Sequence, residues 1–174
     1  MTDPVDLVVR HARVVTETRR PSVGYPDLPR DDTAARGGIQ EFPGHSIGVR
    51  DGVIAWILPD DDVDPIAIAG AEVVDATGHV AIPGLLNSHT HTPMVMFRGA
   101  ASDVPTDEWF NQHVWPMEVN LTDHDIRLGA RIAIGELLLS GVTSFADHYF
   151  GMDTIAEEVE AAGIRALLAS TFFS

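Results

Sequence analysis

The feature that most restricts how this chain can fold is an alternation of two patterns that begins near residue 81. Short apolar segments typical of strands alternate with amphipathic segments typical of helices. We expect strands at 85–91, 142–146 and 164–172, with helices between them, and we expect the first of these strands to be buried. Successive strand–helix units build a parallel sheet with helical cover, so this part of the chain is assigned to the α/β class.

The two longer helices carry clear end signals. Thr122 followed by Asp125 is a capping-box pattern, and Gly141 is placed to end the helix that follows. A second helix is expected at 152–162, ended by Gly163. Both helices show an apolar stripe at helical spacing, which predicts that one face of each packs against the sheet.

The first 80 residues follow a different pattern, that of short β hairpins. A β-branched strand is expected at 7–15, and Asp51-Gly52 between apolar runs predicts a two-residue hairpin turn. A further short strand is expected at 73–75. The stretch 17–44 is rich in proline, glycine and charge, and we interpret it as a long insertion. Two domains are therefore expected, 1–80 and 81–174.

Composition narrows the classes of partner. The net charge is −15, all 11 basic residues are arginine, and this surface repels nucleic acid and anionic membranes. Adaptation to a salty cytoplasm and an arginine-rich codon bias explain the charge equally well. There is no cysteine, so a metal would have to bind histidine and carboxylates. The acidic N-terminus is unlike a signal peptide, and no apolar run could span a bilayer, so we expect a cytoplasmic protein.

The pattern that carries chemistry is His89-Thr90-His91 at the end of the first expected strand. Residues two apart in a strand point to the same side, so both imidazoles would project from the carboxyl end of the sheet, where active sites of parallel α/β folds form. Such a pair suits one divalent metal, with Zn²⁺ expected first and Fe²⁺ as the alternative. A bare His-x-His pair is a weak signal because it also arises by chance. Its place at a strand end after a domain boundary strengthens it.

Several segments together resemble the amidohydrolase superfamily, in particular its branch of 5-methylthioadenosine/S-adenosylhomocysteine deaminases and triazine chlorohydrolases. The resemblance covers about residues 46–174. The matching segments are 74–78, 82–91, 96–99, Trp109, 115–118, 135–136, 140–147 and 162–166. It implies the N-terminal part of a (β/α)₈ TIM barrel, preceded by part of a small β-sandwich.

The resemblance also implies an activity and a set of site residues. The activity is metal-dependent hydrolytic deamination of an adenosine-type nucleoside or a related amino-substituted N-heterocycle. By resemblance, His89 and His91 are metal ligands, and Glu118 binds the ribose hydroxyls of the substrate. A carboxylate suits vicinal hydroxyls because it accepts two charge-assisted hydrogen bonds. The alternative for Glu118 is a surface glutamate that follows Pro116.

Other residues near the expected site are open to two interpretations. A short helix is expected to begin at Thr106 or Asp107 and to end at Pro116. This helix carries two aromatic residues, Trp109 and Phe110. They either line a substrate pocket or pack the helix against the barrel. His113 is interpreted as a residue near the substrate pocket. His148 is interpreted as a local variation of the family pattern after the second strand.

The sequence lacks counterparts of the remaining family ligands. A (β/α)₈ barrel usually takes about 250 residues, and the family's third histidine, catalytic glutamate and late aspartate are not found after His91. We therefore expect a truncated barrel that contains no catalytic acid or base. We also expect the 174 residues alone to be inactive and to self-associate as a homo-oligomer through an open sheet edge.

Three alternatives to an adenosine-type deaminase remain at this point. The first is a triazine chlorohydrolase or a guanine- or cytosine-type deaminase with the same metal site. The second is a two-metal amidase, which would need a bridging lysine beyond this sequence. The third is a remnant without catalytic activity.

Overall fold

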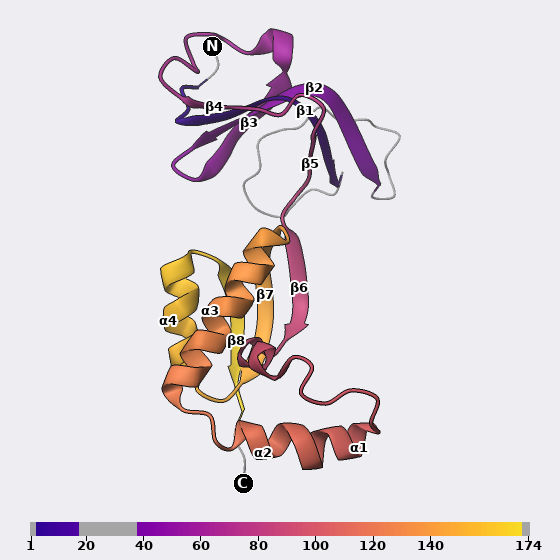
Figure 1. Ribbon diagram of the computed structural model, residues 1–174. Helices are drawn as coiled ribbons and strands as arrows, with labels where there is room; N and C mark the ends of the chain where they lie inside the picture. The colour runs from indigo at the N-terminus through magenta and orange to yellow at the C-terminus, as the bar shows by residue number, and fades with distance from the viewer. Residues whose placement is uncertain (1–2, 18–37, 172–174) are drawn as a thin grey trace. The chain divides into compact units, whose positions relative to one another are not determined.

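The computed structural model describes residues 3–17 and 38–171, and the chain divides into two compact units, residues 1–83 and residues 84–174 (Figure 1). Each unit is described by itself. No helix in the described part of the chain is long and apolar enough to cross a membrane.

The first unit contains a single mixed sheet among its described residues. Its strands are ordered β3-β2-β1-β4, and β5 also pairs with β1. The β1–β2 and β2–β3 pairs are antiparallel, whereas β4 and β5 run parallel to β1. The bounds are β1 Leu7–Glu17, β2 Ile39–Arg50, β3 Val53–Pro59, β4 Glu72–Asp75 and β5 Val80–Ala81.

The predicted hairpin turn is confirmed. Asp51 and Gly52 have φ values of 52° and 74°, and they join Arg50 to its partner Val53. Positive φ at both positions matches the twist of the flanking strands, which explains why this dipeptide makes the turn. Val8 of β1 and Trp56 of β3 belong to a buried apolar cluster that also contains Val5 and Val63.

The predicted insertion at 17–44 is partly wrong. Residues 18–37 lie outside the described residues, but residues 39–44 belong to strand β2 and pair with β1. Strand pairing here overrides a local composition that is rich in turn formers. The register between β1 and β2 shifts near Ala12 and Val14, so the pairing continues through irregular steps rather than a regular ladder.

The described residues of the second unit contain a three-stranded parallel sheet in the order β6-β7-β8. Helix α3 connects β6 to β7, and helix α4 connects β7 to β8, so the predicted alternation is confirmed. The bounds are β6 Leu85–Thr90, η2 Thr92–Phe97, α1 Thr106–Glu108, η3 Trp109–Val114, α2 Trp115–Glu118, α3 Asp123–Leu139, β7 Val142–Tyr149, α4 Met152–Ala162 and β8 Arg165–Ser170.

The end signals of α3 and α4 act as the sequence predicts. The Thr122 hydroxyl accepts a hydrogen bond from the Asp125 N–H, and the Asp125 carboxylate accepts one from the Thr122 N–H. This reciprocal pair satisfies backbone donors that the first helical turn leaves without partners. Gly141 and Gly163 follow the two helices with φ values of 79° and 69°, a conformation that glycine adopts without strain.

Three predictions for the second unit are wrong in detail. Pro116 does not end a helix, because α1, η3 and α2 form one continuous helical stretch from residue 106 to 118. In the π-helical turn at η3, the Trp115 N–H donates to the Phe110 carbonyl five residues earlier. This wider turn comes directly before Pro116, which has no N–H to donate, and the helix continues through the proline. The first strand is also not buried, since Leu86 is 70% exposed, and β7 extends to Tyr149.

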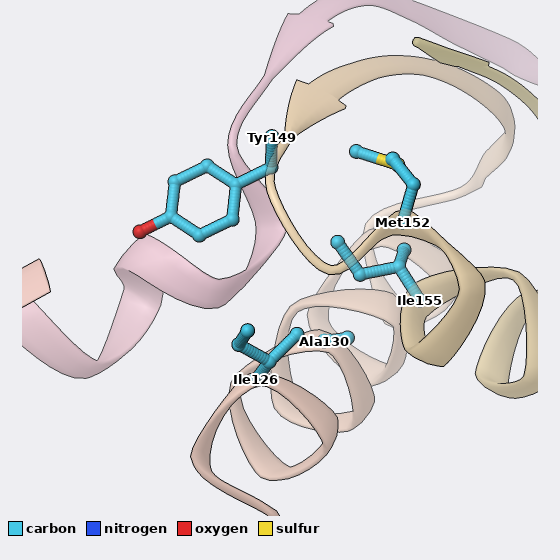
Figure 2. Packing of buried hydrophobic residues seen from close by; sticks show 5 residues of the cluster. All are labelled: Ile126, Ala130, Tyr149, Met152 and Ile155. Atoms are coloured by element: carbon cyan, nitrogen blue, oxygen red, sulfur yellow. The ribbon is translucent and has the colours of Figure 1, made fainter. Parts of the chain in front are cut away.

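The helices cover one face of the sheet. The residues of β7 that alternate toward this face are buried: Phe145, Asp147 and Tyr149. Phe145 packs with Ile134 of α3, and Tyr149 packs with α3 and α4. Figure 2 shows the second cluster, which groups Ile126, Ala130, Met152 and Ile155 with Tyr149.

Helix α3 also fixes the position of η2, the short helix after β6. A side chain at Gly129 would approach the Pro93 carbonyl oxygen to 2.7 Å, so the absence of one lets the two helices touch. This contact holds the segment directly after His91 against the rest of the unit.

A charged network joins α3 to α4. The Glu158 carboxylate is 6% exposed and accepts hydrogen bonds from Arg127 Nη1 at 2.7 Å and from Arg131 Nε at 2.7 Å. These bonds, first from Arg131 and next from Arg127, lower the pKa of Glu158 from its ordinary 4.5 to about 2. The ionised carboxylate is therefore favoured in the folded state.

We expect Glu158→Gln to lower the Tm at neutral pH, because Arg131 then loses its charged acceptor and Arg127 keeps only Glu157. A folded-state pKa that is depressed contributes stability above about pH 4.5, and this contribution is lost as the pH falls toward 2. Thermal melts across this range should show the Tm gap narrowing with acid. Glu160→Gln, an exposed residue on the same helix, is the control. A gap that stays constant with pH would contradict the assignment.

Candidate active site

The two predicted metal ligands lie next to each other at the carboxyl end of β6. The ring centroids of His89 and His91 are 4.9 Å apart in a T-shaped arrangement. They do not reach this geometry by regular alternation, because β6 contains a bulge: Asn87 pairs with Phe145 and Thr90 pairs with Asp147. The extra residue re-aims the chain, and His91 lies just beyond the strand at the start of η2.

The ring of His91 is oriented by the neighbouring strand. Its Nδ1 lies 2.7 Å from the carbonyl oxygen of His148, near the end of β7. A carbonyl only accepts hydrogen bonds, so Nδ1 carries the proton and Nε2 of the neutral ring keeps its lone pair. Metal-binding histidines commonly have this backbone partner on the other ring nitrogen.

The residues present fit a metal as part of its coordination sphere. The orientation of His91 leaves Nε2 available, and the His89 ring is adjacent. The described residues contain no group of three or more histidine, aspartate or glutamate side chains that could hold a metal ion. A catalytic zinc site takes three protein ligands, so this chain supplies two at most from its described part.

A second clamp holds the same segment. Thr92 donates to Asp147 Oδ2 through its hydroxyl at 2.5 Å and through its backbone N–H at 3.2 Å. Both residues are buried, and Asp147 Oδ1 has no hydrogen-bond partner among the described residues. Thr92 therefore supplies both hydrogen bonds that the structure gives this carboxylate. The end of β7 thus holds the residue after His91 as well as His91 itself.

Glu118 lies at the end of α2 and is 6% exposed, so it is not a surface residue. Its Oε1 accepts a hydrogen bond of 2.6 Å from the Tyr149 hydroxyl. Burial and, next, the Glu118 carboxylate raise the pKa of Tyr149, which keeps the phenol protonated as a donor. In Figure 1 the α1–α2 stretch lies beyond the arrowhead of β6, and the hydrogen bond ties it to the end of β7.

Tyr149 contacts both the predicted metal ligand His91 and the predicted substrate-binding residue Glu118. Its ring centroid is 6.2 Å from that of His91, while its hydroxyl reaches Glu118. The His148 ring is also near His91, with centroids 5.2 Å apart. His113 lies in η3, where its Nε2 is 3.9 Å from a Glu108 carboxylate oxygen.

The sequence interpretation overlooked three residues that organise this site. Asp147, Tyr149 and the carbonyl of His148 all belong to β7, which the sequence pattern ended at residue 146. The available signal was strand alternation, since Phe145, Asp147 and Tyr149 share one face when the strand is extended by three residues.

Comparison with known proteins identifies the family. The model of the amidohydrolase family matches residues 80–174, which is more than half of the chain. The chain belongs to the amidohydrolase family.

The chain is similar to several curated deaminases. It is 46% identical over 128 residues to a 5-methylthioadenosine/S-adenosylhomocysteine deaminase of Desulforudis audaxviator, covering 74% of this chain and 29% of that protein. It is 44% identical over 117 residues to a 5′-deoxyadenosine deaminase of Methanosarcina mazei, covering 65% of this chain and 27% of that protein. The chain thus spans less than a third of the length of these relatives.

Solved structures agree with the fold. An adenosine deaminase from Xanthomonas campestris with bound zinc superposes with a TM-score of 0.72 at 30% identity, covering 96% of this chain and 34% of that one. An atrazine chlorohydrolase from Arthrobacter aurescens gives a TM-score of 0.69 at 21% identity, covering 94% of this chain and 35% of that one, which shows the fold alone.

We expect Thr92→Val to lower the free energy of unfolding by about 1.5–3 kcal/mol, the cost of removing a hydrogen bond to a buried charged group. Urea titration of the purified protein measures this change. Thr77→Val is the matched control, because it removes a similar hydroxyl-to-aspartate bond, to Asp75, at an exposed position. Equal, small effects of both substitutions would show that the Thr92–Asp147 clamp does not hold the segment.

Proposed function

We propose that this chain is the N-terminal part of a metal-dependent hydrolase that deaminates adenosine-type nucleosides or closely related amino-substituted N-heterocycles. The observation that carries the proposal is the placement of two adjacent imidazoles and a buried carboxylate around the end of β7. The similarity to deaminases of 5-methylthioadenosine and 5′-deoxyadenosine supports the substrate class. The triazine chlorohydrolase alternative rests on similarity of fold alone.

The architecture proposed for the whole enzyme is a (β/α)₈ barrel. In it, β6, β7 and β8 with α3 and α4 form the first units, and the face of this sheet that the helices leave uncovered faces the barrel interior. This accounts for the exposure of Leu86 and Leu167, which are 70% and 74% exposed in the chain alone. The mixed sheet of the first unit would then contribute to a small β-sandwich.

We assign His89 and His91 as two ligands of one divalent metal, with Zn²⁺ as the expected ion and Fe²⁺ as the alternative. The zinc in the Xanthomonas campestris adenosine deaminase supports this assignment. When bound, the metal supplies Lewis-acid chemistry and activates water for attack on the carbon that bears the amino group. This chain's own contribution is orientation: the His148 carbonyl holds the proton of His91 on Nδ1, and the Thr92–Asp147 clamp fixes the backbone that follows.

Glu118 is proposed to accept hydrogen bonds from the ribose hydroxyls of the substrate. Its carboxylate is buried and, among the described residues, Oε1 accepts a hydrogen bond from Tyr149. An ionised carboxylate offers about four lone-pair sites, so acceptor capacity remains for two vicinal hydroxyls. Charge-assisted bonds of this kind favour nucleosides over free bases.

We expect His89→Ala and His91→Ala in the whole enzyme to abolish metal retention. The loss should exceed the roughly 10- to 100-fold decrease in affinity that follows removal of an outer hydrogen-bond partner. Elemental analysis by mass spectrometry after dialysis measures metal per protein. His124→Ala, at an exposed position of α3, is the control. Full metal occupancy in both ligand variants would refute the assignment.

We expect Glu118→Gln to reduce kcat/KM for adenosine by about 10- to 100-fold, because a charge-assisted hydrogen bond is worth about 1.5–3 kcal/mol. The decrease for free adenine should be much smaller. Steady-state ammonia release on both substrates provides the test, with Glu160→Gln as the control for loss of a surface charge. Equal losses on both substrates would indicate a structural role for Glu118.

A further inference from the structure

Tyr149 is held rigidly by the apolar core. It is the last residue of β7, is 5% exposed, and packs with Ile126, Met152 and Ile155 (Figure 2). Its ring also stacks on Phe150 with centroids 4.2 Å apart. Because the ring is buried and belongs to this cluster, the packing of α3 and α4 against the strand restricts the position of the phenolic oxygen.

The hydroxyl of this rigid ring points away from the other labelled side chains in Figure 2. It donates to Glu118 Oε1 at 2.6 Å, and both residues are buried. A buried carboxylate that loses a donor bears a large desolvation cost, so the bond strongly favours one position of Glu118. The protonated phenol can only donate to an ionised carboxylate, which also fixes the direction of the bond.

The same ring lies beside His91, with centroids 6.2 Å apart. The residue before it, His148, supplies the carbonyl that orients the His91 imidazole at 2.7 Å. Two consecutive residues at the end of β7 therefore place both the imidazole and the carboxylate. The separation between these two groups is set by one strand end rather than by the chain that connects η2 to α2.

We propose that Tyr149 is a positioning residue that holds Glu118 at the distance from His91 that an adenosine-type nucleoside requires. The inference rests on the proposed function, in which His91 binds the metal and Glu118 binds ribose hydroxyls. In this role Tyr149 acts through Glu118 and not directly on a metal or on the reacting atoms. Its hydroxyl determines the preference for substrates with vicinal ribose hydroxyls, and its ring serves the core.

The test uses the whole enzyme and two substrates that differ only in those hydroxyls, adenosine and 2′,3′-dideoxyadenosine. Tyr149→Phe keeps the ring and removes the hydroxyl. We expect kcat/KM for adenosine to fall about 10- to 100-fold, mainly through KM, while the value for dideoxyadenosine falls less than about threefold. The ratio of the two values does not depend on the fraction of enzyme that is folded, so partial misfolding leaves the test valid.

Two controls separate positioning from packing. Phe150→Leu disturbs the stacked ring pair but leaves the Tyr149 hydroxyl in place. It should change kcat/KM for both substrates by the same factor. In enzyme stripped of metal by a chelator, calorimetric titration with inosine should show about tenfold weaker binding to Tyr149→Phe, with hypoxanthine binding unaffected. This second measurement reports on the ribose contact without any turnover.

The outcomes distinguish the inference from the function on which it rests. In one outcome, Glu118→Gln lowers kcat/KM for adenosine more than for dideoxyadenosine, whereas Tyr149→Phe lowers both equally. That outcome overturns the positioning role and leaves the proposed function intact. Glu118→Gln that fails to discriminate overturns the ribose role of Glu118 and the inference with it. A double variant whose loss is clearly smaller than the product of the single losses supports the coupling.

Discussion

The parallel pairing of β6 with β7 is the constraint on which the second unit depends. Parallel neighbours need a crossover connection, and here that connection contains the continuous helical stretch 106–118 and α3. The pairing brings the carboxyl ends of both strands to one edge. It therefore places His91 within reach of the His148 carbonyl and leaves the returning chain to deliver Glu118 to the same edge.

Sequence patterns predicted those features that depend on local chemistry. The capping box at Thr122, the glycines after the helices and the Asp51-Gly52 turn all act through bonds within a few residues, so the sequence displays them directly. The order of strand–helix units followed from periodicity for the same reason. The adjacency of His89 and His91 was also foreseen, although the structure reaches it through a bulge that regular alternation does not describe.

The features that were missed depend on partners distant in sequence. The hydrogen bond from Tyr149 to Glu118 joins a residue that follows α3 in the sequence to one that precedes it, and no local pattern indicates it. The pairing of residues 39–44 with β1 likewise prevails over a composition that favours turns. Pro116 was misread because a neighbouring π-helical turn accommodates it, which is a property of the three-dimensional path rather than of the residue.

The bulge in β6 makes the number of residues at this strand end as important as their identity. Between Asn87 and Thr90 the chain has one residue more than its partner strand, and that surplus places His89 inside the bulge. Loss of a single residue there would remove the bulge, and His89 would then lie opposite Ala146 in a regular ladder. Among homologous chains, gaps should therefore accumulate in the connection before α1 and be absent between residues 87 and 92, even where the residues between the histidines vary.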